Sequence, residues 1–441
     1  MKEQIAIQTI GREKPLYSIL YAFIALFPFL IYPWGSNPSH TIPKFLYLIL
    51  FTLALWMFYA VHWAVAKKAA RFRIQSGEWL VFAFLLLIIL STVLSVDRSL
   101  SLWGEALRFE GLFTLFSYIS LFFFSFRFIQ ADQQDGIFQT FLIGSFFVAF
   151  YGILQHFQLD FLPRNSIHEN YTRSYGFFGN PNCFGTYLVL ALLLGKTFYL
   201  KAKPPLQQMA YLGLNGMLFA ALIYSSTRSG WVGVLFGGAF LTVFVVWKRR
   251  DLWRKWLLLY GSFAIIFLLI NVTEQNSYAK RASTLLTDTH KVVQEDQNGR
   301  AGSGRWYIWS TSFPLIADYF WIGSGPDTFA AVFPHRPAEL KENLGNPNKK
   351  VDKAHNEYLQ IAITLGVPAL LIYLLFIAHI FWRGMKRAAQ LKSQDQILLY
   401  GLLAMMLGYL IQAFFNFSVL MVAPFFWIFL GMLYRGACER S

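Results

Sequence analysis

Two arginines and one histidine stand in short polar stretches of an otherwise apolar chain: Arg228 in SSTRSGW, Arg305 in AGSGRWYIW and His355 in HNEYLQ. A guanidinium does not deprotonate in proteins, and its planar fork donates two parallel hydrogen bonds, which suits a phosphate or pyrophosphate. An imidazole titrates near neutral pH and suits a general base that removes the proton of an attacking hydroxyl. These residue types therefore indicate a transfer reaction that involves a phosphate-bearing group.

Each of these residues also has a structural interpretation. Arg228 follows a tight turn between two apolar stretches, and an arginine at a membrane surface can extend its head to the lipid headgroups. An arginine in a polar loop, such as Arg305, is usually solvated. A lone histidine is more often a structural group, but His355 stands where a polar loop returns to an apolar stretch, and this position favours a functional role.

Other chemistries lack the residues they need. No cluster of Asp, Glu and His has metal-ligand spacing, no pair of carboxylates stands out as the acid and base of a hydrolase, and there is no P-loop. The acidic residues Asp97, Glu105 and Glu110 would approach an ion only if their loop folded back. Cys183 and Cys438 are far apart and lie in or beside apolar segments, so neither a disulfide framework nor a Cys-based metal site is expected.

The composition places these residues in a membrane protein. Of the 441 residues, 56% are hydrophobic and only 14% are charged, whereas soluble proteins carry about a quarter of their residues as charged ones. A large soluble enzyme is therefore excluded. At roughly 20 residues per crossing, the sequence predicts an all-α, polytopic transmembrane helical bundle of about twelve spans. The apolar stretches lie near 16–33, 43–65, 78–96, 112–129, 136–158, 182–200, 207–225, 229–247, 255–272, 361–382, 396–415 and 419–435.

The net charge of +15 is explained by the side of the membrane on which the basic residues lie. With twelve spans, 22 of the 38 Lys and Arg residues fall on the side of the two termini, six fall in short loops on the other side, and ten fall in one long loop. Short cytoplasmic loops are enriched in Lys and Arg, whereas the charge of long loops does not direct orientation. We therefore expect a multi-pass protein of the cytoplasmic membrane, with both termini in the cytoplasm and with no nucleic-acid partner.

The chain is expected to have three parts. Residues 1–272 hold spans 1 to 9, residues 273–360 form a long extracytoplasmic loop, and residues 361–441 hold spans 10 to 12. The loop is polar, with helix-like stretches near 275–295 and 303–320 and with glycines and prolines as breakers. It is too short for an independent catalytic domain, and we expect it to form a lid over the membrane bundle.

The motifs and their order resemble a known family. Twelve spans with a long outer loop between spans 9 and 10 are similar to the O-antigen ligase and O-antigen polymerase family of bacterial polytopic membrane glycosyltransferases. The matching pieces are YGFFGNPN at 175–182, SSTRSG with Arg228, GRWYIW with Arg305, GSGPDTF at 323–329 and HNEYLQ with His355. RFEGLF at 108–113 also resembles members from Gram-positive bacteria. Each motif alone is loose, and their order and membrane placement carry the resemblance.

The resemblance implies a metal-independent, inverting transfer of a glycan on the outer face of the cytoplasmic membrane. The donor would be a glycan linked to undecaprenyl pyrophosphate, and the acceptor a hydroxyl of a lipid- or glycan-linked molecule, with membrane lipids around both. By the same resemblance, Arg228 and Arg305 would hold the pyrophosphate and His355 would activate the hydroxyl, without a cofactor. Further substrate-binding residues are expected in or beside these motifs: Arg173, Asn180, Asn182, Asn356, Glu357 and Tyr358.

Several alternatives stay open. Glu357 is a second candidate for the base, and His355 would then steady the leaving pyrophosphate. Ligase and polymerase share a lipid pyrophosphate donor and a hydroxyl acceptor, so the residues do not separate them. A transporter or flippase of lipid-linked saccharides would also have about twelve spans, but it would show two similar halves, whereas the polar residues here gather on one side. A passive membrane scaffold would leave Arg228 unexplained.

Overall fold

The computed structural model describes residues 14–34, 39–65, 74–106, 108–164, 173–283, 304–417 and 419–438. Throughout these residues the regular elements are helices, and one isolated bridge joins Tyr32 to Ser39. The predicted all-α class is therefore confirmed.

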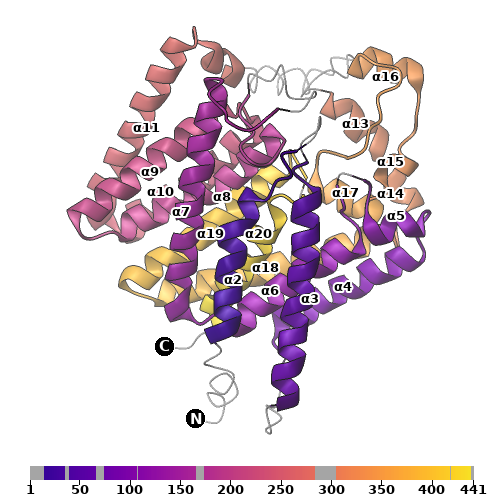
Figure 1. Cartoon of the computed structure of the whole chain (residues 1–441), viewed down its shortest axis with the longest axis horizontal. Helices are drawn as coiled ribbons and strands as arrows, with labels where there is room; N and C mark the ends of the chain where they lie inside the picture. Colours follow the sequence, from indigo (N-terminus) through magenta and orange to yellow (C-terminus); the bar gives the residue numbers. More distant parts are fainter. Residues whose placement is uncertain are drawn as a thin grey trace.

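Twelve apolar helices coincide with the twelve apolar stretches of the sequence (Figure 1). In the described part of the chain, nine of them are long and apolar enough to cross a membrane. These nine are α3 (Ile42–Val65), α4 (Ser76–Val93), α7 (Ala131–His156), α8 (Pro181–Lys201), α9 (Pro205–Tyr224), α10 (Arg228–Lys248), α11 (Trp253–Thr273), α18 (Val367–Gln390) and α19 (Ser393–Ala413). The other three have 13, 17 and 16 residues: α2 (Lys14–Leu26), α6 (Leu112–Phe128) and α20 (Ala423–Cys438). The chain thus forms a multi-pass bundle, and twelve crossings stay a prediction.

Helix α8 forms the centre of the bundle, since its whole apolar window is buried. It packs against α9, α10 and α19. Glycines of α10 let its backbone approach α19, because a Cβ at Gly233 would lie 2.6 Å from the Gly408 carbonyl oxygen. Helices in lipid associate through such close packing of small residues, since no hydrophobic effect drives them together. This packing fixes the amino-terminal end of α10, where Arg228 stands.

The predicted tenth span, 361–382, is wrong at its start. Residues Glu357–Thr364 form a separate short helix, α17, and α18 begins only at Val367. Gly366 separates the two helices with a φ of 91°, and a Cβ there would lie 2.8 Å from the Trp321 carbonyl oxygen. Both the left-handed backbone and the close approach require glycine. Because the residues around it form one apolar run, hydropathy does not reveal the break.

Residues before α17 form a subdomain beside the bundle. Its short helices are α13 (Arg305–Ser312), α14 (Leu315–Asp318), α15 (Phe329–Val332) and α16 (Pro337–Leu344). They enclose a small apolar core made of Tyr307, Ile308, Leu315, Phe329, Phe333, Leu340, Val351, Ala354, Leu359 and Ile363. The subdomain lies at the end of the molecule opposite to the start of α2 and the end of α20 (Figure 1). Of the helix predicted near 275–295, residues 277–283 are helical, and those from 284 on lie outside the described residues.

The loop after α4 folds onto this subdomain. It contains the short helix α5 (Arg98–Trp103). The backbone N–H of Val96 donates to the Ser324 carbonyl at 3.0 Å, and the Ser101 hydroxyl donates to the Pro326 carbonyl at 3.1 Å. The GSGPDTF motif is therefore a docking segment that joins the subdomain to the carboxy-terminal end of α4.

Candidate functional site

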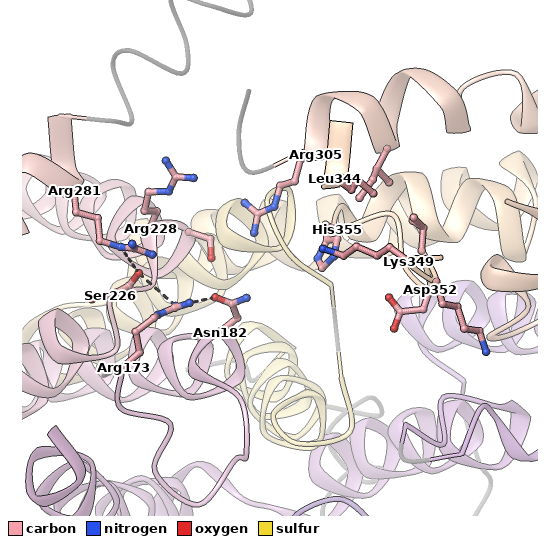
Figure 2. A pocket seen from close by; sticks show the side chains of 14 residues that line it. Arg173, Asn182, Ser226, Arg228, Arg281, Arg305, Leu344, Lys349, Asp352 and His355 are labelled. Carbon is pink, nitrogen blue, oxygen red and sulfur yellow. Dashed lines mark hydrogen bonds between the residues drawn. The ribbon is translucent and has the colours of Figure 1, made fainter. Parts of the chain in front are cut away.

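A cavity of about 240 Å³ lies where the membrane bundle meets the subdomain. The three predicted catalytic residues, Arg228, Arg305 and His355, all line it (Figure 2). The remaining lining residues are mostly basic or polar: Arg173, Asn182, Ser226, Ser229, Arg281, Ile308, Leu344, Lys349, Lys350, Val351 and Asp352. Segments far apart in the sequence thus build one strongly basic site.

Arg228 is the first residue of α10 and follows a tight turn. Within this turn Ser226 has a left-handed backbone with a φ of 51°, which costs a non-glycine residue about 1–2 kcal/mol. Arg173 stabilises the turn, because its Nε donates to the Ser225 carbonyl at 2.9 Å and its Nη2 to the Ser226 carbonyl at 3.4 Å. Arg173 therefore lines the cavity and also positions Arg228.

The two asparagines at the start of α8 occupy different positions. Asn182 lines the cavity, and its Oδ1 accepts a hydrogen bond from Arg173 Nη2 at 3.2 Å. Asn180 is not among the lining residues, and its side chain caps α8 by accepting the backbone N–H of Asn182 at 2.8 Å. Such a cap satisfies a backbone donor and stabilises the helix by about 1 kcal/mol. Asn180 thus fixes the place of Asn182.

Arg305 begins α13, directly after Gly304, whose φ is 81°. Burial, and then the charge of Arg228, lower the pKa of Arg305 to about 10, so its guanidinium is still charged at neutral pH. The two cations therefore act on each other across the cavity. One anionic ligand between Arg228 and Arg305 would stabilise both guanidinium groups.

His355 presents a neutral imidazole to the cavity. Burial lowers the pKa of His355 to about 3, and the charges of Arg305, Arg108, Lys349 and Lys353 act in the same direction. Within the described residues, its buried Nδ1 has no hydrogen-bond partner. The ring packs on Phe417, with 5.3 Å between the ring centroids. A neutral imidazole carries a proton on one nitrogen and accepts one on the other, so this ring can act as a base.

The residues that follow His355 point elsewhere. Asn356 caps α17, since its side chain accepts the backbone N–H groups of Tyr358 and Leu359. The Tyr358 hydroxyl donates to the Leu410 carbonyl at 2.8 Å and ties α17 to α19. Glu357 is not a lining residue of the basic cavity, and its Oε1 accepts the hydroxyl of Tyr373 at 3.2 Å in a second, smaller cavity.

Four charged lining residues lie outside the motifs and were not predicted: Arg281, Lys349, Lys350 and Asp352. Lys350 pairs with Glu105 at 2.9 Å, and Asp352 pairs with Arg108. All four lie in the long loop, where basic and acidic residues are usually solvated. The adjacent pair Lys349–Lys350 is the one local signal, and it does not by itself distinguish a site from a solvated turn.

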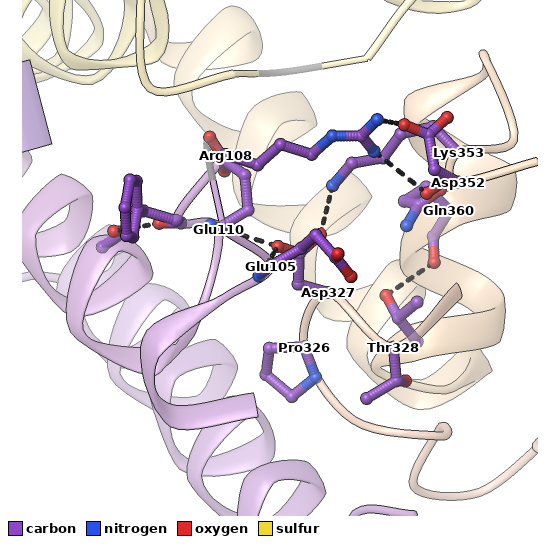
Figure 3. A network of polar contacts seen from close by, with 12 residues as sticks. Glu105, Arg108, Glu110, Pro326, Asp327, Thr328, Asp352, Lys353 and Gln360 are labelled. Atoms are coloured by element: carbon purple, nitrogen blue, oxygen red, sulfur yellow. Dashed lines mark hydrogen bonds and ion pairs between the residues drawn. The ribbon is translucent and has the colours of Figure 1, made fainter. Parts of the chain in front are cut away.

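A polar network holds the segment that carries His355 (Figure 3). At its centre Asp327 Oδ1 accepts from Lys353 Nζ at 2.6 Å, and Asp327 Oδ2 accepts the backbone N–H groups of Glu105 and Glu110 at 2.7 and 3.4 Å. Lys353 and Asp327 are both buried, with 4% and 1% of their side chains exposed. A buried pair of this kind is costly to break, because the remaining charge would have no partner.

The acidic residues of the loop between α4 and α6 have protein partners. Asp97 caps α5 by accepting the backbone N–H of Leu100 at 3.0 Å, and Glu105 pairs with Lys350. Glu110 accepts the hydroxyl of Tyr118 at 3.1 Å, and burial raises the pKa of Glu110 to about 7. Over the described ranges, no group of three or more His, Cys, Asp and Glu residues could hold a metal ion.

Comparison with known proteins gives one family match. Residues 214–374 match the family model described as O-antigen ligase. The matched range contains Arg228, Arg305 and His355. No curated protein matches the chain. Residues 214–374 of this chain are therefore similar to the O-antigen ligase family.

Proposed function

We propose that this protein transfers a glycan from undecaprenyl pyrophosphate to a hydroxyl acceptor on the outer face of the cytoplasmic membrane. The family match supports a membrane glycosyltransferase role in polysaccharide assembly. The observation that carries the finer proposal is the basic cavity, because it combines Arg228 and Arg305 with the neutral imidazole of His355. A cluster of guanidinium groups suits a doubly charged leaving group, and a neutral imidazole suits a hydroxyl nucleophile.

The proposed reaction is a single displacement. His355 accepts the proton of the acceptor hydroxyl while its oxygen attacks the anomeric carbon of the donor sugar. The bond from this carbon to the pyrophosphate oxygen breaks on the opposite face, so the configuration at the carbon inverts. Arg228 and Arg305 stabilise the charge that develops on undecaprenyl pyrophosphate as it leaves. Because guanidinium groups supply this stabilisation, the scheme requires no metal ion.

The remaining predicted residues take supporting roles in this proposal. Arg173 and Asn182 contact the substrate from the cavity wall and hold the turn before Arg228. Asn180, Asn356 and Tyr358 position α8 and α17 through the contacts described above. Glu357 is the weaker candidate for the base, because its carboxylate faces the second cavity.

The function is tested with purified protein and a lipid-linked oligosaccharide, scored for released undecaprenyl pyrophosphate and for glycosylated acceptor. We expect release that depends on the acceptor and continues in EDTA. Activity that is lost in EDTA and restored by magnesium or manganese would contradict the metal-independent scheme. In liposomes, movement of the intact donor across the bilayer without release of undecaprenyl pyrophosphate would instead identify a flippase.

A further inference from the structure

Arg281 brings a third guanidinium from the long loop to the basic cavity. It lies in the helical residues 277–283 that follow α11, and it lines the cavity together with Arg228 and Arg305. Its Nε donates to the Ser226 carbonyl at 3.0 Å (Figure 2). Ser226 is the left-handed residue of the turn before Arg228. Arg281 therefore contacts the element that positions Arg228.

The charge of Arg281 is placed at a cost. Burial lowers the pKa of Arg281, and the charge of Arg228 lowers it further, so these two cations repel each other. The acidic residue in the described lining is Asp352, and it pairs with Arg108. Repulsion between buried guanidinium groups is offset when an anion lies between them.

The other cations of the wall have different surroundings. Arg173 makes hydrogen bonds to the turn and to Asn182, so it acts mainly as a positioning residue. Lys350 pairs with Glu105, and Lys349 is exposed on the side of His355. Arg281 is half-buried, lies beside Arg228 and comes from a different part of the chain.

We propose that Arg281 is a third donor-binding arginine, which binds the pyrophosphate together with Arg228 and Arg305 and joins the long loop to the turn at Ser226. This inference rests on the proposed function, because it takes a lipid pyrophosphate as the donor. It adds that the donor site is completed by a loop residue outside the motifs.

Binding of inorganic pyrophosphate to the full-length protein in lipid nanodiscs tests this proposal. The variant is Arg281→Gln, and the matched control is Lys280→Gln, which removes the same charge from the exposed neighbouring residue. We expect Arg281→Gln to weaken binding at least about tenfold and Lys280→Gln to change it less than about twofold, since a charge-assisted contact is lost only in the former. Equal affinity of Arg281→Gln and the parent would overturn the proposal and leave the proposed function intact. A parent that binds no pyrophosphate would instead contradict the donor itself.

The salt dependence of pyrophosphate binding shows whether Arg281 contacts the anion or only positions the turn at Ser226. The affinity for pyrophosphate falls as the ionic strength rises, and each cation that contacts the anion makes this fall steeper. The affinity of Arg281→Gln should therefore fall less steeply than that of the parent. A dependence as steep as that of the parent would mean that Arg281 only holds the turn, which overturns the contact. Should Arg281→Gln fail to fold, Arg281→Lys keeps the charge and loses the fork, and about threefold to tenfold weaker binding is then expected. Unchanged binding by the Lys variant would count against the proposal.

Discussion

Burial, together with the charges of four nearby cations, keeps the imidazole of His355 neutral far below physiological pH. With a pKa of about 3 in the free protein, the base form of His355 persists as the pH falls and is lost only near that value. A bound pyrophosphate supplies negative charge and raises this pKa again. We therefore expect kcat/KM, which reports the free enzyme, to stay level down to about pH 5, and kcat to fall at a higher pH. The pH profiles of both constants for the parent protein check this. A fall of kcat/KM centred near pH 6.5 would contradict the lowered pKa of His355.

Replacing either candidate base distinguishes their roles. His355→Ala should lower turnover by roughly a hundredfold to ten-thousandfold and leave donor binding nearly unchanged, because a general base acts on the acceptor. Glu357→Gln should keep most of the turnover, since the amide oxygen can still accept the hydroxyl of Tyr373. Turnover and pyrophosphate binding are measured for both variants. An inactive Glu357→Gln, or a His355→Ala that no longer binds the donor, would reverse the assignment.

Arg228 should not tolerate lysine. One ammonium cannot reproduce two parallel hydrogen bonds to a phosphate, so Arg228→Lys is expected to lower kcat/KM by about tenfold to a hundredfold. Arg305→Ala should weaken donor binding as well. The control is Arg336→Lys, in the subdomain that also contains Arg305. The side chain of Arg336 is exposed and pairs with Glu339. Near-normal turnover of a folded Arg228→Lys variant would instead favour the interpretation that Arg228 contacts the lipid headgroups.

Among the elements, Gly325 allows the GSGPDTF segment to pack closely against the loop after α4. Its φ is 116°, and a Cβ there would lie 2.0 Å from Ser95 Oγ and 2.4 Å from Ser101 Oγ. Gly345 is also left-handed, with a φ of 76°, but a Cβ there would have no neighbour within 4 Å. We expect Gly325→Ala to destabilise the protein by at least about 2 kcal/mol and Gly345→Ala by about 1 kcal/mol. Thermal unfolding in detergent measures both, and equal shifts would show that the contact with the serines is unimportant.

Hydropathy predicted the helices of the bundle well and their junctions poorly. The stretches near 229–247 and 182–200 match α10 and α8 within one or two residues, because a run of apolar residues in lipid has no stable alternative to a helix. The break at Gly366 was not predicted, because it depends on the backbone of Trp321, which is distant in the sequence. In the long loop, α13 and α14 lie within the helix-like stretch predicted near 303–320. The short helices α15 and α16 were not predicted, because their burial depends on contacts within the subdomain.

The site shows a similar division. Arg228, Arg305 and His355 stand in motifs and were identified from the sequence, and the structure brings all three to one cavity. Arg281 could not be identified, because an arginine in a polar loop has no local feature that distinguishes it from a solvated one. Asn180 and Asn356 stand in motifs for a different reason, since both cap helices. The motifs therefore contain residues that position the helices of the site as well as residues that line the cavity.

At the scale of the whole molecule, the positive-inside rule predicts which end faces the cytoplasm. Single cysteines at Arg250, between α10 and α11, and at Lys341, in α16, report on opposite ends, and both positions are exposed. In a background with Cys438→Ser, we expect an impermeant maleimide to label Lys341→Cys in intact cells and Arg250→Cys only after permeabilisation. Cys183 is buried and should stay unlabelled. The reverse pattern would place the basic cavity in the cytoplasm and exclude the proposed reaction.

The packing of His355 on Phe417 has a consequence during biosynthesis. The arginine-bearing turn before α10 leaves the ribosome well before Phe417, and at about 5–20 residues per second the interval is on the order of ten seconds or more. Until then the nascent chain has the arginines of the cavity but lacks the surface against which the histidine ring packs. The proposed site is therefore complete only after Phe417, between α19 and α20, has been added to the chain.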